Sequence, residues 1–247
     1  MPDSFFLTHL LNQLLGGIET SAYRAIGLDA DQAANRVSSM NTALSLELIV
    51  VAGLIAFFLL VRATLSVEKP NPAQQIAEVV HEFVGDQADQ IIGHGYERFQ
   101  AFVTCIFLFV ILNNLLGLIP GVVTPTSAPF VPLGIALLTF VYYHYYGFKE
   151  QGFVGYMKHF AGPIWWIAWL LFPIEIISHF ARIMSLTIRL YANMFASDLV
   201  TLVFFSLFPL AIPAVFLGLH AAVSVIQAYV FMLLAMIYLS QAVSHEH

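Results

Sequence analysis

The chain has 247 residues, of which 60% are hydrophobic and only 10% are charged, and its mean hydropathy is +0.83. Soluble domains carry about 25% charged residues, so this chain cannot cover a water-facing surface and must use lipid as its solvent. The 22 Phe and 10 Tyr exclude a disordered chain. The net charge of −6 does not indicate a basic surface for binding nucleic acid. The single cysteine, Cys105, excludes an internal disulfide framework or a cysteine-rich metal cluster.

Residues 1–43 contain no strong span and are predicted to form an N-terminal extramembrane segment, with an amphipathic stretch at 5–18 and a polar connector at 28–41. Residues 44–247 are predicted to form a single membrane domain. Its first span covers 44–62 and is about 27 Å long, close to the thickness of the hydrocarbon core. An acidic segment with apolar residues at helical spacing follows. It predicts an amphipathic surface helix over 72–93, ending at Gly93 and Gly95.

Two more spans are predicted in the middle of the chain. The uncharged residues 99–119 form the second, which Pro120 and Gly121 stop. A loop with three prolines leads into the third, 131–148, which ends in a cluster of tyrosines suited to a membrane interface.

The last part of the chain consists of two apolar runs, 163–208 and 212–243, separated by Pro209 and Pro213. As helices they would be about 69 Å and about 48 Å long, against a hydrocarbon core of about 30 Å. We therefore predict a long, tilted intramembrane two-helix hairpin, kinked at Pro173. The predicted fold is an all-α membrane protein with three transmembrane helices, one surface amphipathic helix and this hairpin.

The distribution of basic residues predicts the topology. The loops that three spans place on one side contain five of them, whereas the opposite loops contain none; the five are Arg62, Lys69, Arg98, Lys149 and Lys158. Basic loops remain cytoplasmic, so we expect the N-terminus outside and the C-terminus inside.

Four charged residues lie inside the predicted hairpin, and each costs about 2.5–3.5 kcal/mol at the centre of a bilayer. They are Glu175, Arg182, Arg189 and Asp198. A polar stripe at helical spacing connects several of them and comprises Glu175, Ser178, Arg182, Ser185, Arg189 and Asn193. Asp198 lies nine residues after Arg189 and therefore on the opposite side of the helix. A second stripe on the returning helix comprises His220, Ser224 and Gln227.

Arg189 carries the functional prediction. Its guanidinium is always protonated, and Glu175 lies about 21 Å away along the helix, so a carboxylate on another chain is the expected partner. Beside the arginine, the pKa of such a mobile carboxylate would fall by about 1–3 units, and it would release its proton there. Asp198, His220 and Gln227 could relay protons on one side, and Glu175 with neighbouring serines on the other.

A structural role remains open for some of these groups. Four of them could equally form hydrogen bonds that hold helices together: Arg182, Ser178, Ser185 and Ser224. His220 could likewise be a hydrogen-bond donor within the helix packing. We interpret His179 as a packing residue.

Several stretches resemble subunit a of the F-type ATP synthases. They are Pro-Ile-Glu-Ile-Ile-Ser at 173–178, Ser-Leu-Thr-Ile-Arg-Leu-Tyr-Ala-Asn-Met-Phe-Ala at 185–196, Gln-Ala-Tyr-Val-Phe-Met at 227–232, and Asn-Leu-Leu-Gly-Leu-Ile-Pro-Gly at 114–121. The resemblance covers about residues 44–247. Asp198 departs from the pattern, in which glutamate is common.

The resemblance implies a stator subunit of a rotary ATP synthase, with no catalytic site, metal or cofactor of its own. Arg189 would face a ring of c subunits, each with one carboxylate, and would block leakage between two aqueous half-channels. Asn193, Asp198, His220 and Gln227 match the outer half-channel, and Glu175 and Ser178 match the cytoplasmic one. The implied partners are the c-ring, the b-subunit peripheral stalk, the remaining ATP synthase subunits and membrane lipid, in a bacterial inner membrane.

Two alternatives belong to other functional classes. A membrane-anchored b-type cytochrome would hold haem between His179 and His220. A secondary carrier is disfavoured because the sequence has no internal repeat of the transporter type.

Overall fold

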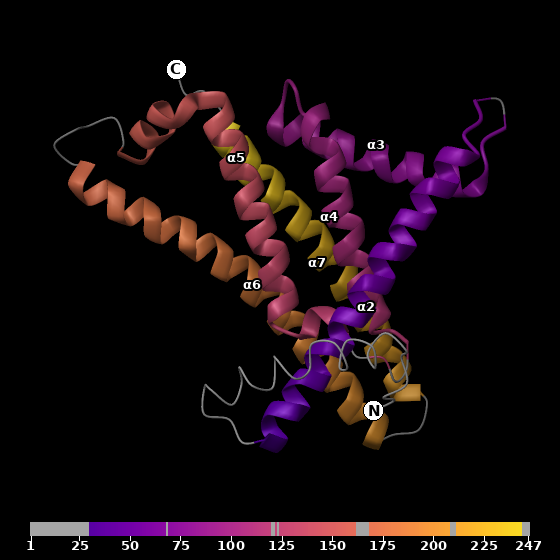
Figure 1. Ribbon diagram of the computed structural model, residues 1–247. Helices are drawn as coiled ribbons and strands as arrows, with labels where there is room; N and C mark the ends of the chain where they lie inside the picture. Colours follow the sequence, from indigo (N-terminus) through magenta and orange to yellow (C-terminus); the bar gives the residue numbers. More distant parts are fainter. Residues whose placement is uncertain are drawn as a thin grey trace.

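The computed structural model describes residues 30–67, 69–119, 122, 124–161, 168–207 and 211–243. Within these ranges the chain forms six α-helices and one short 3-10 helix and contains no strand, so the all-α prediction is confirmed (Figure 1). The helices are α2 (Ala30–Ala63), α3 (Pro72–Ile92), α4 (Glu97–Leu116), η1 (Pro125–Ser127), α5 (Phe130–Ala161), α6 (Ala168–Leu207) and α7 (Ala211–Val243).

Four segments of these helices are long and apolar enough to cross a membrane: Thr42–Ala63, Glu97–Leu116, Trp169–Leu207 and Ala214–Val243. The chain is therefore a multi-pass membrane protein. The predicted third span is present as a helix, α5, but it is not apolar enough to be counted among these four membrane-crossing segments. Its tyrosine cluster and His144 lie inside the helix and make it less apolar than the other four. The arrangement of the helices relative to a bilayer stays a prediction.

The helix α2 is longer than the predicted first span. It begins at Ala30, so the expected polar connector is wrong from that residue onward. No glycine or proline occurs between Gly27 and Gly53, and extending an existing helix through such residues is favourable. The amphipathic stretch predicted at 5–18 lies outside the described residues.

The helix α3 agrees closely with its predicted bounds. Pro72 occupies its first turn, where a missing N–H costs nothing, and Gly93 ends it with a φ of 76°. Only one edge of the helix packs on the protein, with Val84 and Ala88 buried. Ile76 and Val79 of the predicted apolar face are exposed instead, which is typical of side chains that contact lipid.

The helices α4, α5 and α7 form the centre of the molecule, and α6 crosses them obliquely (Figure 1). The helix α6 packs mainly against α5 and α7. Leu190 and Met194 of α6 and Met232 and Met236 of α7 are fully buried in the shared core.

The predicted hairpin helices are present, with different bounds. The 40 residues of α6 continue through Pro173, which does not end the helix, and residues 162–167 lie outside the described part. At about 1.5 Å per residue, α6 is about 60 Å and α7 about 50 Å long.

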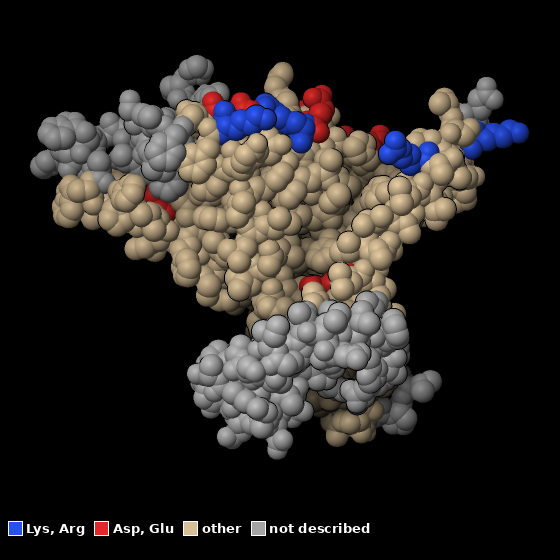
Figure 2. All heavy atoms as spheres, viewed as in Figure 1, with Lys and Arg blue, Asp and Glu red and all other residues tan. Residues whose placement is uncertain are grey.

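The charged residues gather at one end of the molecule, along α3 and the adjoining ends of α2, α4 and α5 (Figure 2). Arg98 at the start of α4 forms an ion pair there with Glu150 of α5. This end contains Arg62, Lys69, Arg98 and Lys149, so the structure brings together the basic residues that the topology prediction used; the side chain of Lys158 is not described.

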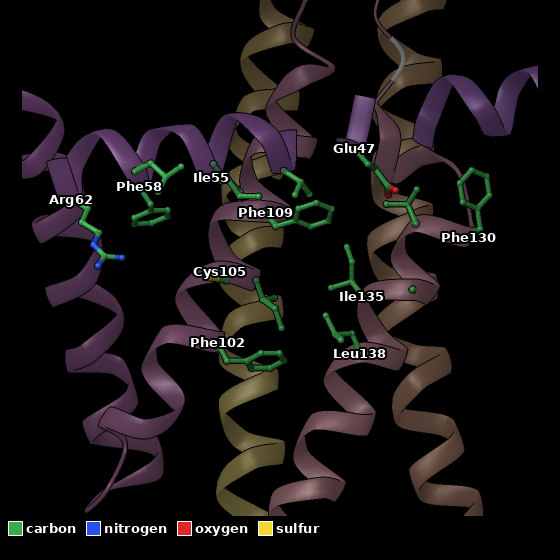
Figure 3. A pocket seen from close by; sticks show the side chains of 16 residues that line it. Glu47, Ile55, Phe58, Arg62, Phe102, Cys105, Phe109, Phe130, Ile135 and Leu138 are labelled. Carbon is green, nitrogen blue, oxygen red and sulfur yellow. The ribbon is translucent and has the colours of Figure 1, made fainter. Parts of the chain in front are cut away.

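An apolar groove of about 740 Å³ separates α2 from α4 and α5 (Figure 3). Its lining includes Phe58, Phe102, Phe109 and Ile135, with Glu47 and Arg62 as the charged members. None of the predicted site residues lines this groove.

Candidate functional site

Arg189 lies near the middle of α6 as an unpaired cation. Its Nη2 atom is 3.4 Å from Oγ of Ser185, one turn away. Among the described residues, no carboxylate oxygen lies within 4.0 Å of the guanidinium. Its neighbours Ile188 and Phe195 are exposed apolar side chains. The charge therefore stands on a partly exposed face of the helix, with Ser185 and Asn193 one turn away on either side and exposed apolar residues beside it.

Asp198 belongs to a polar cluster at the other end of α6, which we call the Asp198 cluster (Asp198, Thr124, His220, Asn114, Thr126 and Ser224). The hydroxyl of Thr124 donates to one carboxylate oxygen at 2.7 Å, and its backbone N–H donates to the other at 3.3 Å. Nδ1 of His220 lies 3.7 Å from the carboxylate, beyond hydrogen-bond length. Each carboxylate oxygen of Asp198 thus accepts one hydrogen bond from Thr124.

His220 is fully buried, and neither ring nitrogen has a hydrogen-bond partner among the described residues. The ring packs against Gly117 at the end of α4. A Cβ atom at that position would lie 3.0 Å from the His220 ring and 1.9 Å from the Thr124 hydroxyl. Only glycine lets the three elements approach this closely.

The rest of the Asp198 cluster ties α4, η1 and α7 together. The hydroxyl of Thr126 donates to the side-chain carbonyl of Asn114 at 2.6 Å, and the amide of Asn114 donates to the backbone carbonyl of Ser224 at 3.4 Å. Asn114 and Ser224 are completely buried. These bonds fix the loop that presents Thr124.

Asn193 and Gln227 connect the two long helices nearer to Arg189. The side-chain amide of Asn193 donates to the side-chain carbonyl of Gln227 at 2.9 Å. A hollow of about 240 Å³ adjoins this pair and is lined by Asn193, Ser197 and Thr201 together with apolar residues. It has room for several water molecules.

Glu175 lies in a second group of side chains, which we call the Glu175 cluster (Glu175, His179, Tyr143 and His144). Oε1 of Glu175 is 3.3 Å from Nε2 of His179, and the hydroxyl of Tyr143 is 3.1 Å from Nδ1 of the same ring. The ring centroids of His144 and His179 are 4.8 Å apart. Ser178 makes no side-chain hydrogen bond within the described residues.

Sequence reasoning missed several members of both clusters. Thr124 and Thr126 lie in a proline-rich loop that gave no signal beyond polarity. The sequence indicates Tyr143 only as part of an interfacial aromatic group. The prediction that His179 is a packing residue does not use its spacing of four from Glu175, which is the signal for this contact. Arg182 lies with its guanidinium carbon 5.2 Å from the ring centre of Tyr238, in a cation–π contact.

The order of these groups along α6 is Glu175, Arg189, Asp198. The arginine is about 21 Å from the first carboxylate and about 14 Å from the second along the helix axis. The predicted residues thus form two separate groups, one toward each end of the helix, with the unpaired cation between them.

Comparison with known proteins identifies the family of the chain. Residues 44–240 match the ATP synthase A chain family. The chain belongs to this family. Across all 247 residues and the full length of the relative, it is 48% identical to ATP synthase subunit a of Koribacter versatilis. It is also 46% identical to ATP synthase subunit a of Solibacter usitatus over 203 residues, 82% of this chain and 87% of the relative.

Membership in the ATP synthase A chain family supports a proton-translocating stator subunit that is not itself catalytic and that belongs to the ATP synthase complex. All seven predicted site residues fall inside the matched region.

The cytochrome alternative is not compatible with the geometry of this ATP synthase A chain family member. His220 lies beside Asp198, whereas His179 precedes Asp198 by nineteen residues, about 28 Å along α6. The two histidines are therefore too far apart to hold one haem iron.

Proposed function

We propose that the chain is the stator subunit of a rotary ATP synthase and forms two aqueous half-channels, which deliver protons to and from carboxylates of the c-ring. In this proposal Arg189 blocks direct leakage between the half-channels. The observation that carries the proposal is the unpaired guanidinium between two separate polar clusters.

The position of Arg189 supports its proposed role. A cation without a carboxylate in its own described chain favours the approach of a carboxylate from another subunit. Near the guanidinium such a carboxylate is stabilised in its ionised form and gives up its proton. The same positive charge repels a proton moving directly from one cluster to the other.

The Asp198 cluster supports an outer half-channel. Asp198 and His220 can bind and release protons, Asn193 and Gln227 supply hydrogen-bonding groups, and the hollow beside Asn193 has space for water. Glu175 supports the cytoplasmic half-channel, since its side chain is one-third exposed. Ser178 is on the same turn and is assigned to that half-channel by spacing alone.

The remaining assignments follow from the same proposal. The partners are the c-ring, the b-subunit peripheral stalk, the other subunits of the complex and membrane lipid. The basic end of the molecule faces the cytoplasm of a bacterium, the N-terminus lies outside and the C-terminus inside, and residues 1–43 are extramembrane.

Replacement of Arg189 tests the proposal. We expect Arg189→Ala to abolish ATP-driven proton pumping in inverted membrane vesicles that contain the complete ATP synthase, because the ring carboxylate would keep its proton. Pumping is measured with a pH-sensitive fluorescent dye.

The matched control is Arg62→Ala, which removes an exposed arginine of α2 far from both clusters. It should pump at the wild-type rate. Wild-type pumping by Arg189→Ala in an assembled complex would refute the role of this residue.

A further inference from the structure

The Glu175 cluster contains a histidine and a tyrosine for which the family resemblance gave no role. We propose that His179 is a proton-binding relay that receives protons from Glu175, and that Tyr143 is the positioning residue that sets the tautomer of its ring. The inference rests on the proposed function, because it places this relay in the cytoplasmic half-channel.

The contacts of His179 define a linear arrangement. Its Nε2 atom lies 3.3 Å from the Glu175 carboxylate, and its Nδ1 atom lies 3.1 Å from the Tyr143 hydroxyl. Both ring nitrogens therefore have partners, one on α6 and one on α5. Glu175 and His179 are four residues apart on one helix, so their separation is fixed by the helix itself.

The exposed fractions of these side chains indicate the direction in which a proton would move. The side chain of Glu175 is 33% exposed and that of His179 only 11%, while Tyr143 is 2% exposed. His179 is also one turn closer to Arg189 than Glu175 is. Water can therefore protonate Glu175 first, and the histidine is the inner of the two proton-binding groups.

The transfer needs no additional reactant. When Nδ1–H of His179 donates to the Tyr143 oxygen, the lone pair of Nε2 faces Glu175. A proton on the Glu175 carboxyl then moves to Nε2, leaving a carboxylate and an imidazolium that remain hydrogen-bonded. The imidazolium later releases the proton toward the ring carboxylate, and the neutral ring returns to the same tautomer.

Other ionisable groups surround the pair. Arg182 lies one turn further along α6, the ring of His144 of α5 lies edge-to-face with the His179 ring, and Tyr238 of α7 contacts Tyr143. None of these is placed between Glu175 and His179, so the proton can pass directly between these two side chains.

The test is the pH dependence of His179→Gln. Glutamine can hydrogen-bond to Glu175 or Tyr143 but cannot bind a proton. ATP-driven pumping is measured in inverted vesicles containing the complete ATP synthase, in which the external buffer sets the pH at the cytoplasmic half-channel. The rate is expressed as the ratio of wild type to variant, which cancels the pH dependence of the catalytic part.

We expect this ratio to rise by about tenfold between external pH 5.5 and 7.5. Imidazole can bind and release protons in this pH range whereas the amide of glutamine cannot, so the wild type has a proton-binding group that the variant lacks. A purely structural role of His179 would give a ratio that does not change with pH, and that result would overturn the inference.

Tyr143→Phe is the second variant, for the case in which His179→Gln does not assemble. It keeps the aromatic ring and removes the hydroxyl at Nδ1, and it should give a smaller rise of the ratio in the same direction. Matched controls are Tyr145→Phe and His81→Gln, whose side chains are exposed and which should leave the ratio at one. A Tyr143→Phe ratio that stays constant with pH would also contradict the inference.

Arg189→Ala in the same preparation separates the two proposals. If that variant pumps, the proposed function fails. If it does not pump while His179→Gln shows a constant ratio, the relay fails and the proposed function remains.

Discussion

Asp198 shows how a single carboxylate is held in an apolar environment. It accepts two hydrogen bonds from one residue, Thr124, and faces a buried histidine whose ring nitrogens have no hydrogen-bond partner in the described part of the chain. The Asp198 side chain is 22% exposed, and these two hydrogen bonds offset part of the cost of removing its carboxylate from water. The Thr124 hydroxyl therefore holds the Asp198 carboxylate in place beside His220.

We predict that Thr124→Ala lowers ATP-driven proton pumping about three- to tenfold. A hydrogen bond to a charged group contributes about 1.5–3 kcal/mol, and the backbone N–H of the residue retains part of that stabilisation. Thr124→Ser, which keeps the hydroxyl, should pump at nearly the wild-type rate. The control Thr64→Ala removes an exposed hydroxyl just after the end of α2. Equal rates for Thr124→Ala and Thr64→Ala would contradict this assignment.

At the residue level the sequence draws attention to the charged residues of α6 but not to the neutral side chains that contact them. Arg189, Asp198 and Glu175 stand out because a charge in an apolar helix is unfavourable and therefore favours a functional interpretation. Thr124 carries no such signal, since threonine is common in loops. Its contact with Asp198 spans 74 residues of sequence, and local patterns contain no information on such contacts.

The end of α4 is the element that holds the Asp198 cluster together. Gly117 follows the last helical residue, and its hydrogen in place of Cβ admits Thr124 from the loop and His220 from α7. The end of α4, the loop and α7 are therefore in close contact at Gly117. Any larger side chain at this position would push Thr124 and His220 away.

We predict that Gly117→Ala reduces proton pumping at least as far as Thr124→Ala does. The added methyl group would displace the Thr124 hydroxyl, 1.9 Å away, and press on the ring of His220. In the double variant Gly117→Ala with Thr124→Ala, the two reductions in pumping rate should not add. Thr124→Ala already removes the hydroxyl that the new methyl group would displace.

The control is Gly134→Ala in α5, where a Cβ atom meets nothing within 4 Å. It should pump normally. Normal pumping by Gly117→Ala as well would show that this close approach is unimportant.

At the element level, helix type and approximate bounds followed from the sequence, whereas some interruptions did not. The α3 helix agreed with prediction because Pro72 and Gly93 mark its ends. The break in α5 at Gly152, with a φ of 70°, was not predicted, since a single glycine is compatible with a continuous helix. Pro173 was expected to kink α6, and its effect within a long helix depends on neighbouring helices that local sequence does not specify.

The whole molecule is polarised, with most of the charged residues visible in Figure 2 at one end and extensive apolar surface elsewhere. Lys69 lies at the charged end, and Ser206 lies near the last residue of α6 at the opposite end (Figure 1). Both side chains are exposed, so they report on the two sides of the membrane.

We predict opposite labelling of single cysteines at these two positions. In a Cys105→Ser background, Lys69→Cys should react with a membrane-impermeant maleimide in inverted vesicles, and Ser206→Cys only in right-side-out vesicles. Basic segments remain cytoplasmic, which gives this orientation. The reverse pattern would invert the topology, and the Cys105→Ser chain alone serves as the unlabelled control.

The oblique course of α6 has a mechanical consequence. A helix of about 60 Å fits within a hydrocarbon layer of about 30 Å only if its axis leans about 60° from the membrane normal. Glu175 and Asp198 then differ by about 17 Å in depth but by about 30 Å parallel to the membrane plane. In the proposed mechanism, protons that arrive at one carboxylate and depart at the other would be carried sideways by the ring, so that a gradient across the membrane would become lateral motion of the ring and hence torque.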